Sequence, residues 1–185
     1  MSTAATPALM TAEEFRLMPD NGKPTELVRG VPVEMSIPGP RHGQICLKTG
    51  RLVGNYADEH DHGHTVSNDS AVITQRGPDT VRGADIAFYS YAKVPRGPMP
   101  IGYIDVPPDL AIEVRSPSDR WKAIINKVNE YLNAGVTLVC VLDEQTAMAH
   151  VFASDRPPII VPADGELDLS EVLPGFRVPL RRFFE

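Results

Sequence analysis

Hydrophobic and polar positions follow three successive patterns between residues 105 and 142, and this stretch predicts the centre of the fold. Over 110–115, successive side chains are expected to alternate between two faces of a strand. Over 124–132, apolar side chains recur at helical spacing, and Gly135 is expected to end the helix. Residues 136–142 read as a second, buried strand. A strand, a helix and a strand in this order predict a right-handed crossover that lays the helix over one face of a sheet.

An acidic residue in the first of these strands requires an explanation. Glu113 points away from the apolar face that Leu110, Ile112 and Val114 form. A buried carboxylate is costly unless a metal ion or a cationic side chain compensates it. Lys127 flanks the apolar stripe of the helix, where it could bury its stem and keep its ammonium in water, or could reach the carboxylate.

The remaining patterns predict further helices and strands on both sides of this unit. Ser118 or Asp119 is expected to cap the central helix. The proline-rich residues 91–108 are expected to form a loop. The other predicted elements are a short helix begun by the capping box Thr11–Glu14, a hairpin over 25–35, a helix over 41–60, strands over 65–75, 81–90, 147–153, 157–162 and 176–180, and a helical turn over 169–173.

Length and composition favour one soluble domain. A chain of 185 residues with 42% hydrophobic residues is large enough for one core, so we expect a single domain over 11–185 after a disordered segment, residues 1–10. No secretory signal or membrane-length apolar run is present, which favours a cytoplasmic protein that does not contact a membrane. Cys46 and Cys140 are expected to be reduced core thiols rather than a disulfide.

The charge balance constrains the possible partners only weakly. A net charge of −6 argues against a non-specific nucleic-acid binder, because such proteins normally present a basic surface. It leaves a nuclease possible, because clustered metal-binding acids themselves add negative charge.

A second acid lies inside the strand predicted just before the proline-rich loop. Asp85 and Glu113 would lie on adjacent strands if that loop connects neighbours within one sheet. Two such acids can hold a divalent cation, which polarises a phosphate and lowers the pKa of its bound water. A nearby lysine can neutralise charge that develops on the phosphoryl oxygens. The alternative is purely structural: Asp85 and Glu113 would form salt bridges with Arg82, Arg115 or Lys127.

A histidine cluster offers a separate metal-binding hypothesis. His60, His62 and His64 alternate along the chain and could bind zinc or nickel if all three rings shared one strand face. Their position between a helix and a strand, next to Gly63, favours a solvated loop instead.

Six short blocks give a further basis for interpretation. They are ELVRG at 26–30, PRHG at 40–43, RGAD at 82–85, PPDLAIEVRSPSDR at 107–120, the pattern K-x-x-x-Y-x-x-x-GV at 127–136, and EVLPGFRVPL at 171–180. In this order, over nearly the whole chain, they resemble the Uma2 family, endonucleases of the PD-(D/E)XK restriction-endonuclease-like superfamily.

The resemblance implies a fold, an activity and a set of site residues. The implied fold is an α/β (α+β) restriction-endonuclease-like core, a mixed β-sheet flanked by helices. The implied activity is Mg²⁺- or Mn²⁺-dependent cleavage of phosphodiester bonds in nucleic acid, with DNA as the expected substrate. Asp85 and Glu113 match the two metal-binding acids, and the carbonyl of Val114 would be a further ligand. Lys127 matches the catalytic lysine, and Glu26 matches an acid that completes the metal shell.

Two further positions are assigned to substrate binding through the same resemblance. Arg115 occupies the place, two residues after the second acid, where the superfamily usually has its lysine. His42 matches the His-Gly position of the family and is expected to contact phosphate, with a capping or packing role as the alternative. The chain departs from its relatives at Ala123, where many carry an acid, and at Gly83-Ala84, which precede Asp85 in place of a proline.

These departures and the acidic balance support a rival hypothesis. A catalytically degenerate member could keep the nuclease fold as a binding or regulatory module. If the chain does cut both strands of a duplex, paired sites favour a homodimer.

Overall fold

The computed structural model describes residues 9–185, which form four helices, an eight-stranded sheet and a two-stranded sheet. None of the helices in this range is long and apolar enough to cross a membrane. In chain order the elements are α1 (Ala12–Arg16), β1 (Thr25–Val28), β2 (Val31–Glu34), α2 (Pro40–Glu59), β3 (Gly63–Gln75), β4 (Thr80–Ser90), β5 (Leu110–Arg115), α3 (Trp121–Asn133), β6 (Leu138–Asp143), β7 (Met148–Ala153), β8 (Arg156–Val161), β9 (Glu166–Asp168), β10 (Arg177–Pro179) and α4 (Arg181–Phe184).

The large sheet is mixed, as the family resemblance implied. Its order is β2-β1-β4-β5-β6-β7-β8, and β3 also pairs with β4. Every pairing in it is antiparallel except β5 with β6, which are parallel and are joined through α3. The predicted strand–helix–strand unit is therefore confirmed, and Glu113 lies near its centre.

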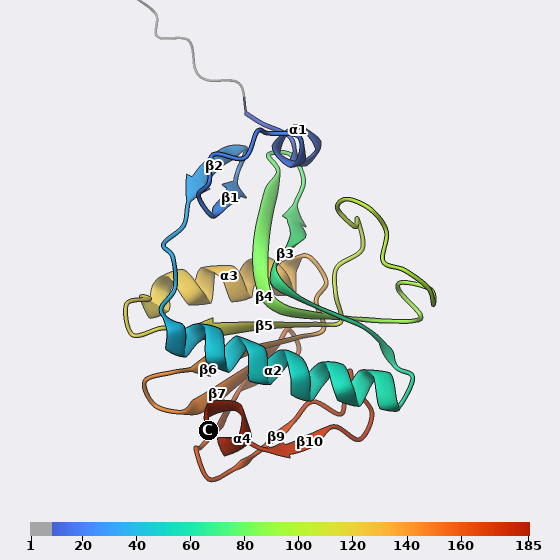
Figure 1. The fold of residues 1–185 in the computed structure, drawn as a ribbon, viewed down its shortest axis with the longest axis vertical. Coiled ribbons are helices and arrows are strands. Elements are labelled where there is room, and N and C mark those ends of the chain that lie inside the picture. Colours follow the sequence, from blue (N-terminus) through green and yellow to red (C-terminus); the bar gives the residue numbers. More distant parts are fainter. Residues whose placement is uncertain (1–8) are drawn as a thin grey trace, which may run out of the picture.

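The long strand β4 connects two parts of this sheet. Its first residues pair with β1 at Leu27↔Val81, and its later residues pair with β5 from Ile86↔Ile112 to Phe88↔Leu110. Between these two regions β4 bends away from β5, as Figure 1 shows where β4 rises toward the β1–β2 hairpin. The divergence opens a fork in the sheet immediately before Ile86.

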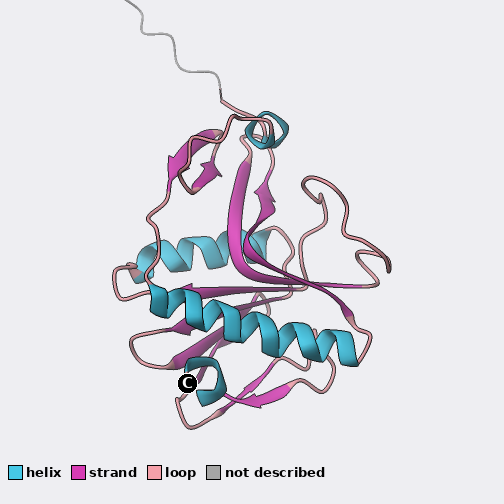
Figure 2. Cartoon of the chain, viewed as in Figure 1, coloured by secondary structure: helices cyan, strands magenta, loops and turns pink. Residues whose placement is uncertain are grey.

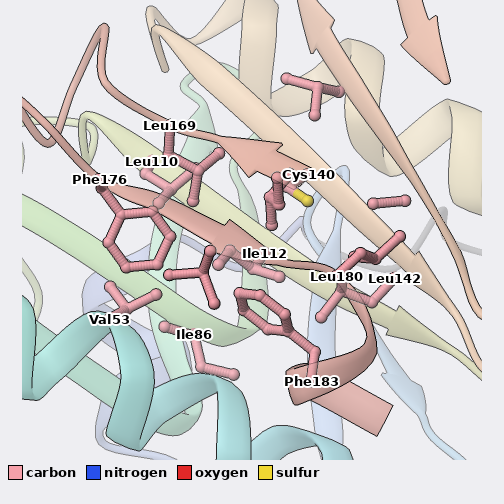
Figure 3. Packing of buried hydrophobic residues seen from close by; sticks show 14 of the residues in the cluster. Val53, Ile86, Leu110, Ile112, Cys140, Leu142, Leu169, Phe176, Leu180 and Phe183 are labelled. Carbon is pink, nitrogen blue, oxygen red and sulfur yellow. The ribbon is translucent and has the colours of Figure 1, made fainter. Parts of the chain in front are cut away.

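Helices α2 and α3 cover opposite faces of the sheet, on either side of this fork (Figure 2). Side chains of even-numbered β5 positions, such as Ile112, pack with α2, α4 and the small β9–β10 sheet. Ala111 and the odd-numbered positions of β6 pack instead with α3. Figure 3 shows the first of these clusters, in which Val53 of α2 lies against Ile86 and Phe183 of α4 lies beside Leu180. Alternation along the strands therefore gives the sheet one core on each face.

Several boundaries differ from the sequence-based expectations. Arg120, not Ser118 or Asp119, is the N-cap of α3, and no side chain caps that helix. Asp119 instead closes the preceding turn, because its Oδ2 accepts hydrogen bonds from Ser116 N (2.8 Å) and Ser116 Oγ (2.7 Å). Strand β9 was not predicted. Of the segment expected to be disordered, residues 1–8 lie outside the described range, whereas the Met10 N–H donates to the carbonyl of Gly30.

Candidate active site at the strand fork

Asp85 occupies the fork between β4 and β5. Its Oδ2 accepts a hydrogen bond from the backbone N–H of Val114 at 2.7 Å, in place of the ladder bond that β4 no longer provides. The carboxylate therefore lies in the plane of the sheet, and not on the face of Ala87 and Tyr89 as strict alternation would require. Because the N–H and C=O of a strand residue point to the same side, the Val114 carbonyl faces this fork as well.

Glu113 lies next to Asp85, on the side of the fork that α3 covers. The β4–β5 pairing ends at Ile86↔Ile112, and the hydrogen bond from the Val114 N–H to Asp85 Oδ2 holds Asp85 at the fork beside Glu113. The Tyr131 hydroxyl donates to Glu113 Oε1 at 2.7 Å, and Lys127 Nζ donates to Oε2 at 3.1 Å. Burial raises the pKa of Glu113 to about 7, and the negative charge of Asp85 adds to this, although Lys127 opposes it. A nearby positive charge therefore stabilises the ionised form of the Glu113 side chain.

Lys127 bridges two buried carboxylates. Its Nζ lies 3.1 Å from Glu113 Oε2 and 2.9 Å from Glu26 Oε1 of β1. Burial of the ammonium lowers its pKa, but the charges of Glu113 and Glu26 more than offset this and the pKa of Lys127 is raised. Lys127 thus reaches the strand carboxylate, and of the two positions that the sequence allowed for it, the inward one is observed.

Arg82 bonds to the Glu26 oxygen that Lys127 does not contact. Its Nη1 donates to Glu26 Oε2 at 2.7 Å, while its Nε and Nη2 form a two-bond pair with Glu130 of α3 at 2.5 and 2.9 Å. The N–H of Gly83 also donates to Glu26 Oε1 at 3.2 Å. Arg82 therefore ties β1, β4 and α3 together, and in the structure it pairs with neither Asp85 nor Glu113.

Asp69 is an acid of this cluster that the sequence did not reveal. The β3–β4 register shifts between Ser67↔Ile86 and Ser70↔Ala84, so that Asn68 and Asp69 bulge opposite Asp85. Burial raises the pKa of Asp69, and the charge of Asp85 raises it further. Asn and Asp are disfavoured in strands, so this Asn-Asp pair inside an otherwise strand-forming stretch was the available signal for a bulge.

His42 and Cys46 face Asp85 from α2. The Nε2 of His42 lies 3.5 Å from Asp85 Oδ2, and its Nδ1 lies 3.4 Å from Cys46 Sγ. The hydrogen bond to Asp85 raises the pKa of His42, although burial opposes it. Burial and the charge of Asp85 raise the pKa of the Cys46 thiol. His42 was expected at the site through the family pattern, whereas Cys46 was expected only as a core thiol; it lies one helical turn after His42.

Arg115 has contacts different from those expected of a substrate-binding residue. Its Nη1 forms a buried ion pair with Asp143 Oδ1 at 2.8 Å, and its guanidinium stacks on Trp121 at 5.0 Å from the ring centroid. The parallel register pairs Arg115 directly with Asp143, which explains the contact. Because the side chain is only 8% exposed and already bonded, we assign Arg115 to the packing of β5 against β6 and α3.

The histidine cluster does not assemble into a ligand set. His60 Nδ1 contacts the Tyr56 carbonyl oxygen at 2.9 Å, and His64 Nε2 contacts the Pro95 carbonyl oxygen at 3.0 Å. Among the described residues, the only group of three or more potential metal ligands with mutually close atoms is His42, Cys46 and Asp85. The zinc hypothesis for residues 60–64 is therefore not supported.

A separate surface hollow lies away from this cluster. It has a volume of about 460 Å³ between α2 and the C-terminal segment, and is lined in part by Arg51, Tyr56, Phe176 and Arg182. None of the fork residues lines it.

The charges at the fork fit a bound cation. Glu26, Glu113 and Asp85 are 5%, 4% and 9% exposed, and Asp69 and Glu130 adjoin them. These five carboxylates face two permanent cations, Lys127 and Arg82. Carboxylate and carbonyl oxygens are the ligands that Mg²⁺ and Mn²⁺ prefer. The donor set at the fork therefore suits such an ion.

Comparisons with known proteins agree with this fold. The chain is similar to a crystal structure from Anabaena variabilis described as a putative nuclease belonging to DUF820, with a TM-score of 0.81 and 15% sequence identity; the match covers 95% of this chain and 97% of the other. No curated protein matches the chain. The Uma2 family, described as "Putative restriction endonuclease", matches residues 12–181. Since this match spans nearly every described element, the chain belongs to the Uma2 family.

Proposed function

We propose that this protein is a divalent-cation-dependent endonuclease that hydrolyses phosphodiester bonds of DNA. The observation that carries the proposal is the fork itself, where Asp85 and Glu113 lie side by side and Lys127 bonds to Glu113 from the following helix. The description of the family as a restriction endonuclease supports nucleic acid, and DNA in particular, as the substrate.

In the proposed reaction, different side chains bind the cation and stabilise charge on the phosphate. Asp85, Glu113 and the Val114 carbonyl would hold a Mg²⁺ or Mn²⁺ ion. Such an ion polarises a phosphoryl oxygen and lowers the pKa of a bound water. Hydrolysis would form one phosphorus–oxygen bond to a water and break another to the leaving sugar oxygen, which would take up a proton. In this proposal Lys127 donates a hydrogen bond where negative charge develops on the phosphate.

Glu26 and His42 are proposed to position other residues of the site. Both Glu26 oxygens already accept hydrogen bonds or ion pairs from Arg82, Gly83 and Lys127, so we propose Glu26 as a residue that positions Lys127 rather than as a direct metal ligand. His42 orients Asp85 through Nε2, on the side opposite Glu113. We also propose that His42 contacts a substrate phosphate from this position.

Plasmid nicking in the presence of Mg²⁺ or Mn²⁺ tests the proposal. Asp85→Asn and Glu113→Gln should each abolish nicking and the calorimetric heat of Mn²⁺ binding, with the fold retained by circular dichroism. The matched control is Asp109→Asn, because Asp109 is a carboxylate that binds Ser90 N and Lys93 just before the first residue of β5. This control should nick plasmid DNA like the wild type.

Two results would contradict the proposal. Undiminished nicking in Asp85→Asn or Glu113→Gln would remove these acids from the reaction. Wild-type protein that binds DNA but cleaves neither DNA nor RNA with any divalent cation would instead favour the degenerate binding module. Light scattering on the same samples tests the second expectation, that two copies associate to cut both strands of a duplex.

A further inference from the structure

The α2 side of the fork differs chemically from the α3 side. Toward α3, Asp85 is accompanied by Glu113 and by the ammonium of Lys127, which offer oxygen ligands and a charge. Toward α2, it is accompanied by an imidazole and a thiol, those of His42 and Cys46. Hard cations prefer the first kind of donor set, whereas imidazole and thiolate ligands select borderline and soft ions such as Zn²⁺.

We propose that His42, Cys46 and Asp85 form a second cation site, which takes Zn²⁺ or a similarly thiophilic divalent ion. One ligand atom from each of the three residues lies within 4.8 Å of the other two. Ligands at the usual zinc distances of roughly 2.0–2.3 Å stand about 3.4 Å apart around a tetrahedral ion. His42 Nε2 and Asp85 Oδ2 are already 3.5 Å apart, whereas Cys46 Sγ lies 3.4 Å from the other ring nitrogen, Nδ1, so binding through Nε2 requires the Cys46 side chain to move toward that atom.

The local structure explains why these three groups meet. His42 and Cys46 are four residues apart on α2, so they lie on the same face of the helix, one turn after another. That face also carries Ile45, Thr49 and Val53 into the core, which fixes the rotation of the helix against the sheet. Asp85 projects into the fork from β4 and meets both side chains there.

The fourth position of the ion remains available to a small ligand. Three protein ligands and one open position are typical of exchangeable or catalytic zinc sites rather than closed structural ones. The charge of Asp69 in the neighbouring bulge acts on both His42 and Cys46. Binding exchanges the thiol proton of Cys46 for a sulfur–metal bond and involves no electron transfer; the proton goes to solvent.

Sharing of Asp85 makes the two cation sites competitors. An ion bound by His42 and Cys46 occupies a carboxylate that the hard-cation site requires, and places two positive charges beside it. Zn²⁺ therefore acts as an inhibitor of Mg²⁺ or Mn²⁺ binding. This consequence for activity rests on the proposed function, whereas the binding of Zn²⁺ itself does not.

Cobalt spectroscopy on the full chain tests the site directly. Co²⁺ substitutes for Zn²⁺, and a thiolate ligand gives its complex an intense near-ultraviolet charge-transfer absorption. This absorption should appear in the wild type, disappear in Cys46→Ser, and bleach when Zn²⁺ is added. Cys140→Ala is the matched control, since Cys140 is the only other cysteine, is fully buried in the α2-side core, and should leave the absorption unchanged.

Two further measurements complete the test. His42→Asn should weaken Zn²⁺ binding by at least about tenfold. Mn²⁺ binding should survive in Cys46→Ser and should be weakened in wild-type protein that is loaded with Zn²⁺. The thermal unfolding temperature of each variant checks that the fold is intact.

Specific results would overturn the second site. They are a wild-type complex without the charge-transfer absorption, an absorption that persists in Cys46→Ser, or one that vanishes in Cys140→Ala while the fold is retained. Failure of the proposed nuclease is distinguishable: a cobalt–thiolate complex in a protein that cuts no nucleic acid keeps the zinc site and removes only the proposed function.

Discussion

Replacement of Lys127 by methionine tests whether burial makes its ion pairs important. Lys127 is 15% exposed and bonds to Glu113 and Glu26, each 6% exposed in its side chain. Removing one partner from a buried ion pair leaves an uncompensated charge and costs about 3–5 kcal/mol. For a chain of this size, where 1 kcal/mol shifts the melting temperature by roughly 2–4 °C, Lys127→Met should melt about 10 °C below the wild type in EDTA.

The matched comparison is Lys23→Met. Lys23 pairs with Glu34 at 2.7 Å, closer than either contact of Lys127, but the two side chains are 59% and 56% exposed. An exposed pair contributes at most about 1 kcal/mol, so this variant should lose no more than a few degrees. Equal losses in Lys23→Met and Lys127→Met would refute the reasoning that burial, and not distance, determines the contribution.

The effect of Lys127→Met should also depend on pH. The pKa of Glu113 is raised by burial from 4.5 to about 7, and Lys127 keeps it from rising further. A carboxyl with a raised folded-state pKa destabilises the protein at pH values above that pKa, and this cost disappears as pH falls toward the unfolded-state pKa. Without Lys127 the pKa of Glu113 moves higher still. Thermal unfolding should therefore show a larger loss at about pH 9 than at about pH 6, and the opposite order would contradict the assignment.

The remaining predictions concern the bulge and the histidine. Gly83→Ala should destabilise the protein by about 1–3 kcal/mol, because its Cβ would lie 2.9 Å from Asp69 Cβ; Gly50→Ala, whose Cβ finds only Ile86 at 3.9 Å, should stabilise α2 by up to about 1 kcal/mol in the same urea titration. The Asp85→Asn variant should lower the pKa of His42 toward its ordinary value in an NMR titration, since Asp85 is the main cause of the increase; an unchanged pKa would contradict the Nε2 contact.

The pattern of side chains was sufficient to predict the scaffold of the site. Alternation along two strands identified Asp85 and Glu113 as acids in apolar surroundings, and helical spacing placed Lys127 at the flank of an apolar stripe, from which it could face solvent or reach Glu113. The structure brings these three together, because Asp85 bonds to the Val114 N–H next to Glu113 and Lys127 of α3 bonds to Glu113. Their chemical roles stay predictions until the variants are measured.

The parts of the site that the sequence did not reveal depend on long-range register. Asp143 becomes the partner of Arg115 only because β5 and β6 pair in parallel, residue against residue. Asp69 lies near Asp85 only because β3 carries one extra residue at that level, so that Asn68 and Asp69 together face Asp85. Cys46 resembles an ordinary core residue until the position of Asp85 in the fork is known. Local periodicity contains none of this information, since it describes each segment without its neighbour.

The fork cluster has a consequence for how the protein loses its native state. Its members come from β1, α2, β3, β4, β5 and α3, between residues 26 and 131, so no short fragment of the chain can reproduce it. Strand pairing joins the β1–β2 hairpin to β4 at Leu27↔Val81, and Arg82 and Gly83 of β4 also bond to Glu26. Separation of this hairpin from β4 would withdraw Glu26 from Lys127 and expose Leu27 of a small third cluster, while the two larger cores under α2 and α3 stay packed. The cluster should thus come apart at lower denaturant than the sheet beneath it.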